Sequence, residues 1–120
     1  MLDSRGAIRI LIFDEQPVVR LGLRSLLDNY PTLKVVGETG QMGELERLVD
    51  QTQPNVLVVD PGNDPDELES LCTLCRRLEK CIVIIYTTRA DQARMIMAAL
   101  KLGVSGFLLK EAGDTPRSKG

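Results

Sequence analysis

The sequence contains no histidine and no tryptophan, and its 120 residues include only two Phe and two Tyr. Imidazole catalysis and histidine-based metal sites are therefore excluded. The formal net charge is -2, so the chain lacks the basic excess that favours nucleic-acid binding. It also lacks an apolar run long enough to span a bilayer, and residues 1–12 lack the pattern of a signal peptide. These absences predict a cytoplasmic protein without a membrane-spanning segment, and they disfavour DNA binding by this chain alone.

Cysteine is scarce and odd in number, with Cys72, Cys75 and Cys81. All three lie on or beside segments expected to be buried, which favours reduced core thiols over a disulfide framework. Cys72 and Cys75 form a C-x-x-C pair, but a structural zinc site needs four ligands and the chain offers only Cys81 besides. We therefore interpret the pair as core packing.

The apolar content of 43% suffices for one compact core. Short apolar runs predict five strands, at Ile8–Phe13, Leu33–Gly37, Val56–Val59, Ile82–Tyr86 and Gly106–Leu109. Helical spacing predicts helices from Gln16 to about Asn29, Met42 to Thr52, about Asp66 to Glu79 and about Asp91 to Leu102. Because strands and helices alternate over short connections, the sequence predicts an α/β fold with a doubly wound five-stranded parallel sheet.

Two of these helices have clear apolar stripes. The first repeats apolar residues at Val19, Leu23, Leu26, Leu27 and Tyr30. The third is expected to turn Leu68, Leu71, Cys72, Cys75 and Leu78 inward.

Polar residues follow the strands at the points where they end. The set comprises Asp14 and Glu15 after the first strand, Asp60 with Pro61-Gly62 after the third, Thr87 and Thr88 at the fourth, and Lys110 after the fifth. The carboxyl ends of parallel strands share one edge, where α/β proteins bind ligands, so these residues should meet in one crevice.

Each residue of this set also has a common structural role. An acidic pair before a helix compensates the helix dipole, an Asp before Pro-Gly forms a turn, a Thr caps a helix, and a Lys after a strand is solvated. Three carboxylates at one point repel each other without a cation, and hard oxygen ligands favour Mg²⁺. A hydroxyl and a lysine beside that ion suit a transferred phosphoryl group, with Asp60 as its acceptor.

The residues that carry a family resemblance are Ile8 to Leu27 (IRILIFDEQPVVRLGLRSLL) and Leu100 to Lys110 (LKLGVSGFLLK). They resemble the receiver domains of two-component response regulators, particularly those of the NarL/LuxR type, which precede a helix-turn-helix DNA-binding domain. The resemblance runs from about Ile8 to Lys110 and implies a flavodoxin-like sheet of order 2-1-3-4-5. It also implies that a histidine kinase supplies the phosphoryl group and that the chain is a signalling domain rather than an enzyme.

The resemblance assigns roles to individual residues. Asp14 and Glu15 match the acidic pair that holds Mg²⁺, and Asp60 matches the phosphoacceptor, which is also a metal ligand. Gly62 matches a residue whose backbone carbonyl binds the metal, so its identity matters little. Lys110 matches the lysine that contacts the phosphoryl group, and Phe107 matches the aromatic switch residue. The phosphoryl-contacting hydroxyl is either Thr87 or Thr88.

Several departures keep a second function open. Glu15 stands where the family commonly has Asp, the loop from Pro61 to Pro65 differs from the family pattern, and Arg89 follows Thr88 where receivers favour a small residue. The alternative is a degenerate pseudo-receiver that acts as a phosphorylation-independent interaction or dimerisation module. A nucleotide- or flavin-binding enzyme is the least favoured, because no Gly-rich phosphate turn follows the first strand.

The last ten residues, EAGDTPRSKG, have no apolar periodicity. We therefore expect a receiver domain over residues 1–112, a tail or linker start over 113–120, and a fifth helix that is missing or replaced. Such a change would leave an apolar flank bare beside the first helix. A homodimer is expected, either through this flank or through the face of the fourth helix and fifth strand.

Overall fold

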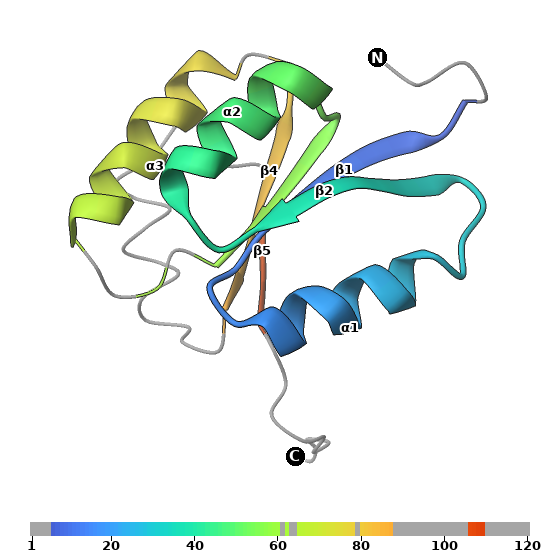
Figure 1. The fold of residues 1–120 in the computed structure, drawn as a ribbon. Coiled ribbons are helices and arrows are strands. Elements are labelled where there is room, and N and C mark those ends of the chain that lie inside the picture. The colour runs from blue at the N-terminus through green and yellow to red at the C-terminus, as the bar shows by residue number, and fades with distance from the viewer. Residues whose placement is uncertain (1–5, 61, 63–64, 79, 88–105, 110–120) are drawn as a thin grey trace.

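The computed structural model describes residues 6–60, 62, 65–78, 80–87 and 106–109 (Figure 1). Its elements are β1 (Ile8–Phe13), α1 (Pro17–Leu27), β2 (Leu33–Thr39), α2 (Met42–Thr52), β3 (Val56–Val59), α3 (Pro65–Arg77), β4 (Ile82–Thr87) and β5 (Gly106–Leu109). The five strands pair in parallel in the order β2-β1-β3-β4-β5. This order confirms the predicted doubly wound, flavodoxin-like sheet.

The helices cover the sheet from two sides, with α2 and α3 on one face and α1 on the other (Figure 1). Alternate residues of a strand point to opposite faces, so β1 and β3 contribute to two apolar clusters. On the α2 and α3 face, Leu11, Phe13 and Leu57 belong to the larger cluster. On the α1 face, Ile10 and Ile12 belong to the smaller one.

Helix α1 is amphipathic but has no fully buried residue. Leu23 and Leu27 pack against the smaller apolar cluster, as the sequence pattern predicts. Leu26 and Tyr30 do not follow that pattern, because 55% and 52% of their surfaces are exposed. Leu26 lies about 100° around the helix from Leu27, and Tyr30 lies beyond the helix end.

Helix α3 presents most of the expected inward stripe, since Leu71, Cys72 and Cys75 are buried and Leu78 packs against the same cluster. The side chain of Leu68 falls outside the described part. Leu74 is also buried, with 1% exposed, although it is not part of the predicted stripe. The helix ends at Arg77, two residues before the predicted end. Strand β2 continues beyond its predicted end at Gly37 to Thr39, because it pairs with the whole of β1. The predicted fourth helix and the proposed absence of a fifth helix fall outside the described residues.

The three cysteines are free thiols, as predicted. Burial, together with the neighbouring Cys72 and Cys81 thiols, raises the pKa of Cys75 to about 12. Burial also raises the pKa of Cys81 to about 11. Since the thiolate is the reactive form, these side chains are poor nucleophiles at neutral pH. Of the helices that the structure describes, none has the length and apolar character needed to cross a membrane.

Candidate functional site

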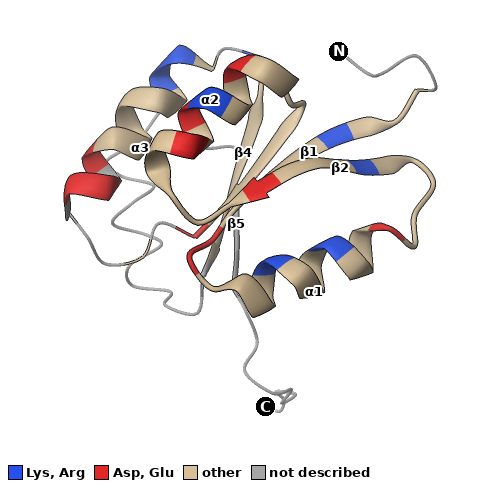
Figure 2. Ribbon diagram, viewed as in Figure 1, with Lys and Arg blue, Asp and Glu red and all other residues tan. Residues whose placement is uncertain are grey.

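The carboxyl ends of β1 and β3 bring two of the predicted carboxylates onto adjacent strands. Phe13 pairs with Val59, so Asp14 and Asp60 each follow one member of this pair. The backbone N–H of Asp60 donates to the carbonyl of Phe13 at 2.8 Å. Figure 2 shows the acidic residues that follow these two strands at the same edge of the sheet.

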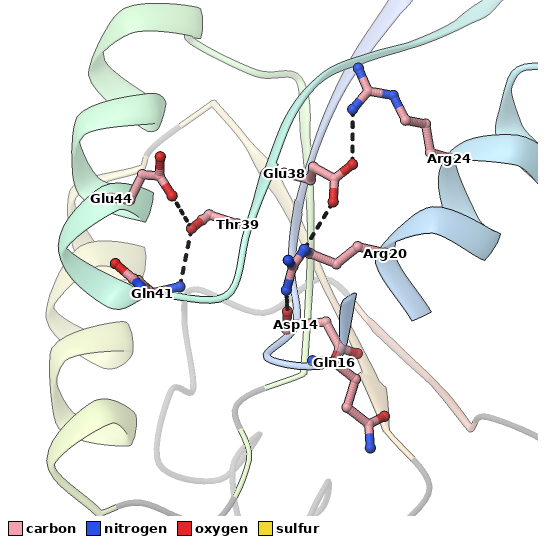
Figure 3. A network of polar contacts seen from close by, with 8 residues as sticks. All are labelled: Asp14, Gln16, Arg20, Arg24, Glu38, Thr39, Gln41 and Glu44. Carbon is pink, nitrogen blue, oxygen red and sulfur yellow. Dashed lines mark hydrogen bonds and ion pairs between the residues drawn. The ribbon is translucent and has the colours of Figure 1, made fainter. Parts of the chain in front are cut away.

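Asp14 is held at three of its polar groups, and Figure 3 shows the contact with Arg20. Its backbone N–H donates to the carbonyl of Thr39 at 3.0 Å, and its own carbonyl accepts from Arg20 Nη1 at 2.5 Å. Its Oδ1 accepts from the backbone N–H of Gln16 at 2.9 Å. Only 2% of Asp14 is exposed, so its carboxylate is buried and fixed in direction before any ligand binds.

Glu15, after β1, lies near Gly62 in the loop that follows β3. The backbone N–H of Gly62 donates to Asp60 Oδ1 at 3.1 Å, which fixes the rotation of that carboxylate. Glu15 Oε2 lies 3.7 Å from the position that a Cβ on Gly62 would occupy. The φ of 70° at Gly62 is in the left-handed region, so the identity of this residue matters, contrary to the expectation from the resemblance.

The other predicted site residues are described less fully. Thr87 is the last residue of β4 and pairs with Leu109, while Phe107 lies in β5 and pairs with Ile85. The positions of these two backbones are described, but their side chains fall outside the described part. Thr88 and Lys110 lie outside it altogether.

The donor atoms near the ends of β1 and β3 fit a hard cation. Mg²⁺ keeps several waters and is bound through one or two carboxylates, and the buried carboxylate of Asp14 beside Asp60 supplies this chemistry. Among the described residues, no three His, Cys, Asp or Glu side chains form a group that could hold a metal by themselves. The described carboxylates therefore supply hard oxygen donors of the kind that Mg²⁺ binds, and they do not form a closed cage.

Sequence reasoning missed the ion-pair network that surrounds Asp14. Glu38 in β2 accepts from Arg20 Nε and from Arg24 Nη1, each at 2.9 Å (Figure 3). Arg20 and Arg24 are four residues apart, a spacing that places both on one face of α1. Their carboxylate partner lies on another element, so only the sheet register could identify it.

Thr39 has a second role at the beginning of α2. Its Oγ1 accepts from the backbone N–H of Gln41 at 3.1 Å and donates to Glu44 Oε1 at 2.5 Å (Figure 3). A hollow of about 760 Å³ adjoins this turn and the Arg20 network. The β1, β2 and α2 ends are thus joined by polar contacts around Asp14.

A second hollow of about 940 Å³ lies at the opposite edge of the sheet. Its lining includes Arg9, Arg77 and Lys80 beside the ends of α2 and α3. The Arg9 guanidinium donates to the carbonyl of Thr52 in the last turn of α2. These cations complement the negative ends of the helix dipoles, which gives them a structural role.

A parallel sheet of this order, with carboxylates at the ends of β1 and β3, defines a flavodoxin-like α/β protein with a polar site at the carboxyl edge. The model of the response regulator receiver domain family matches residues 10–116. The chain therefore belongs to the response regulator receiver domain family, which confirms the resemblance found in the sequence.

The relatives include transcriptional regulators. The chain is 30% identical to the transcriptional regulatory protein LiaR of Bacillus subtilis, over 86% of this chain and 49% of LiaR. It is 32% identical to the DNA-binding transcriptional activator DevR/DosR of Mycobacterium tuberculosis, over 87% of this chain and 48% of that protein. The nitrate/nitrite response regulator NarL of Escherichia coli is 28% identical, over 92% of this chain and 51% of NarL. The chain thus spans about half the length of these relatives.

Solved structures agree with this assignment. The RcsB response regulator of Salmonella typhimurium superimposes with a TM-score of 0.74 at 25% identity, over 86% of this chain and 54% of that chain. The response regulator domain of Thermotoga maritima CheB gives the same TM-score and identity, over 89% of this chain and 81% of that chain. The family and the fold are therefore supported by independent comparisons.

Proposed function

We propose that this chain is a cytoplasmic receiver module that accepts a phosphoryl group from a histidine kinase onto Asp60 and signals to an output domain or partner. The observation that carries the proposal is the buried, fixed carboxylate of Asp14 on the strand next to Asp60. The transcriptional regulators among the relatives support a transcriptional output. In this role the chain is a phosphoacceptor and not an enzyme that turns over a substrate.

The acceptor reaction follows from the chemistry of Asp60. One carboxylate oxygen forms a bond to phosphorus while the bond from phosphorus to the donor's imidazole nitrogen breaks, and the imidazole leaves with the electron pair. Asp14, Glu15, Asp60 and the carbonyl of Gly62 would hold Mg²⁺, which supplies charge neutralisation for the phosphoryl oxygens when bound. The Gly62 N–H orients the Asp60 carboxylate through Oδ1.

Three further residues complete the proposal. Lys110 would contact the phosphoryl group, as would the hydroxyl of either Thr87 or Thr88, since β4 and β5 continue the same sheet beyond β3. Phe107 in β5 would respond to that hydroxyl and change the outer face of the sheet edge. The new charge on Asp60 would therefore shift a population of conformations rather than create a new fold.

The test is the intact mass of the protein after incubation with acetyl phosphate, with and without Mg²⁺. We expect one added phosphate that requires Mg²⁺ and that is absent from the Asp60→Asn variant, because the amide cannot act as the acceptor. The Asp28→Asn variant removes an exposed carboxylate at the C-terminal end of α1 and should still form the adduct.

Either of two results would contradict the proposal. An adduct of equal yield in Asp60→Asn would place the phosphate elsewhere. No adduct on the parent protein would instead favour the pseudo-receiver, in which the same scaffold binds partners without phosphorylation. The exposed position of Glu15 and the absence of a closed three-ligand group among the described residues are the observations that favour this second candidate.

The exposed apolar face of α1 supports a homodimer as the partner arrangement. Val18, Leu21 and Leu26 are 75%, 62% and 55% exposed, and they account for most of the large exposed hydrophobics that the described residues include. A second copy of this chain would cover them, because one helix with such a face can pack against its own symmetry mate. The alternative face includes the fourth helix, which lies outside the described residues.

Replacing Leu21 with Lys should convert the dimer to a monomer, since a charge would then lie in the apolar contact. Sedimentation velocity over a concentration series measures the change. Thr73→Lys adds the same charge at an exposed position of α3, on the other side of the sheet from α1, and is the control. A parent protein that is monomeric at every concentration, or a Leu21→Lys variant that remains dimeric, would contradict the α1 interface.

A further inference from the structure

Arg20 connects three parts of the structure around Asp14. Its Nη1 donates to the carbonyl of Asp14 at 2.5 Å, and its Nε donates to Glu38 Oε1 at 2.9 Å (Figure 3). Asp14 lies at the end of β1, Glu38 is in β2 and Arg20 is in α1. The side chain of Arg20 is only 18% exposed, so both bonds form where solvent competes little.

Gly40 allows Arg20 to approach the acidic residues. A Cβ at Gly40 would lie 2.7 Å from Arg20 Nη1, 3.0 Å from Glu15 Cα and 3.1 Å from the carbonyl oxygen of Asp14. Two of these neighbours are backbone atoms and could not give way by a side-chain rotation. The guanidinium of Arg20 therefore sits against the backbone of the acidic pair in a space that only glycine leaves open.

We propose that Arg20 is a positioning residue for the candidate site, which holds the backbone of Asp14 and Glu15 so that their carboxylates can bind a divalent cation. This inference rests on the proposed function for the identity of the cation, Mg²⁺, whereas the contacts of Arg20 do not depend on that function. Among the described residues, Arg20 makes no hydrogen bond to a carboxylate of the site itself. It acts through the carbonyl of Asp14, while Oδ1 of the same residue accepts from the Gln16 N–H.

Arg24 provides a matched comparison on the same helix. It bonds the same carboxylate, through Glu38 Oε2, at the same distance of 2.9 Å. Within the described part of the chain, it makes no hydrogen bond to the loop that carries Asp14. A purely structural function of the network, joining α1 to β2, would therefore involve both arginines, whereas positioning of the acidic pair would depend on Arg20.

The experiment compares Arg20→Gln with Arg24→Gln in the full chain. Isothermal titration with MgCl₂ should give a dissociation constant about tenfold higher for Arg20→Gln, as for other residues that orient metal ligands, and a change below about twofold for Arg24→Gln. Hydrogen exchange of the Gln16 amide, which donates to Asp14 Oδ1, should accelerate about tenfold in Arg20→Gln only. Urea unfolding of both variants shows how far each arginine contributes to stability.

Each outcome decides the proposal. Equal Mg²⁺ affinities and equal Gln16 exchange rates in the two variants would overturn it. A parent protein that binds no Mg²⁺ would refute the proposed function, and the Gln16 exchange rates would then decide the positioning role alone. If Arg20→Gln does not fold, Arg20→Lys keeps the charge with a single donor group, and its Gln16 exchange must still exceed that of Arg24→Gln.

Discussion

Replacing Asp14 with Asn is expected to slow phosphate-adduct formation about a hundredfold while the free energy of unfolding stays equal or rises. Asn keeps the Oδ1 that accepts from the Gln16 N–H, so the turn after β1 should persist. It removes the negative charge that a divalent cation requires at this edge. Only 2% of Asp14 is exposed, so burial of its charged carboxylate carries a desolvation cost that a neutral Asn side chain reduces.

Two measurements separate these effects. The time course of intact mass with acetyl phosphate gives the rate, and thermal unfolding with and without Mg²⁺ gives the stabilisation by the ion. The parent protein should gain stability with Mg²⁺, and Asp14→Asn should not. Asp28→Asn again serves as the control for the loss of one negative charge, and it should respond to Mg²⁺ like the parent. An adduct rate in Asp14→Asn equal to that of the parent would remove Asp14 from the site.

Replacing Leu57 with Ala should lower the free energy of unfolding by about 3 to 4 kcal/mol. Leu57 is fully buried in β3, where it pairs with Leu11 on one side and Val83 on the other. The truncation would leave a cavity among strands that cannot close it without breaking their ladders. Urea denaturation, followed by circular dichroism, measures the loss as a lower midpoint at an unchanged slope.

The next residue of the same strand is the control for this change. Val58 points to the α1 face, where it is half-buried and packs beside the smaller cluster. Val58→Ala should therefore cost only about 1 kcal/mol. If both variants lost the same free energy, the two faces would contribute equally, and the larger cluster under α2 and α3 would not be the main core.

Local sequence alone predicted most of the elements that the structure describes. The bounds of α2, β3 and β5 match the predicted ranges at Met42–Thr52, Val56–Val59 and Gly106–Leu109. Apolar runs and helical periods are local signals, and they depend little on the rest of the chain. The alternation of strands and helices then leaves few topologies, because parallel crossovers are right-handed.

The sequence predicted the part of the candidate site whose position depends only on where the strands end. Asp14 and Asp60 could be placed together because every parallel strand ends at the same edge of the sheet. The left-handed conformation of Gly62 and the contacts of Arg20 could not be predicted in this way. They depend on how two loops and a helix approach each other, which no local pattern specifies.

The sequence by itself determined the elements, their order and the edge that carries the acidic residues, because periodicity and strand ends are local properties. The tertiary structure decided the surroundings of Asp14 through the register of β2. A shift between Ile10 and Leu11 pairs Phe13 with Thr39 and Ile12 with Glu38. Ile12 lies on the α1 face, so Glu38 meets Arg20 there. A one-residue slip would turn every side chain of the strand to the other face, and only the folded sheet fixes that choice.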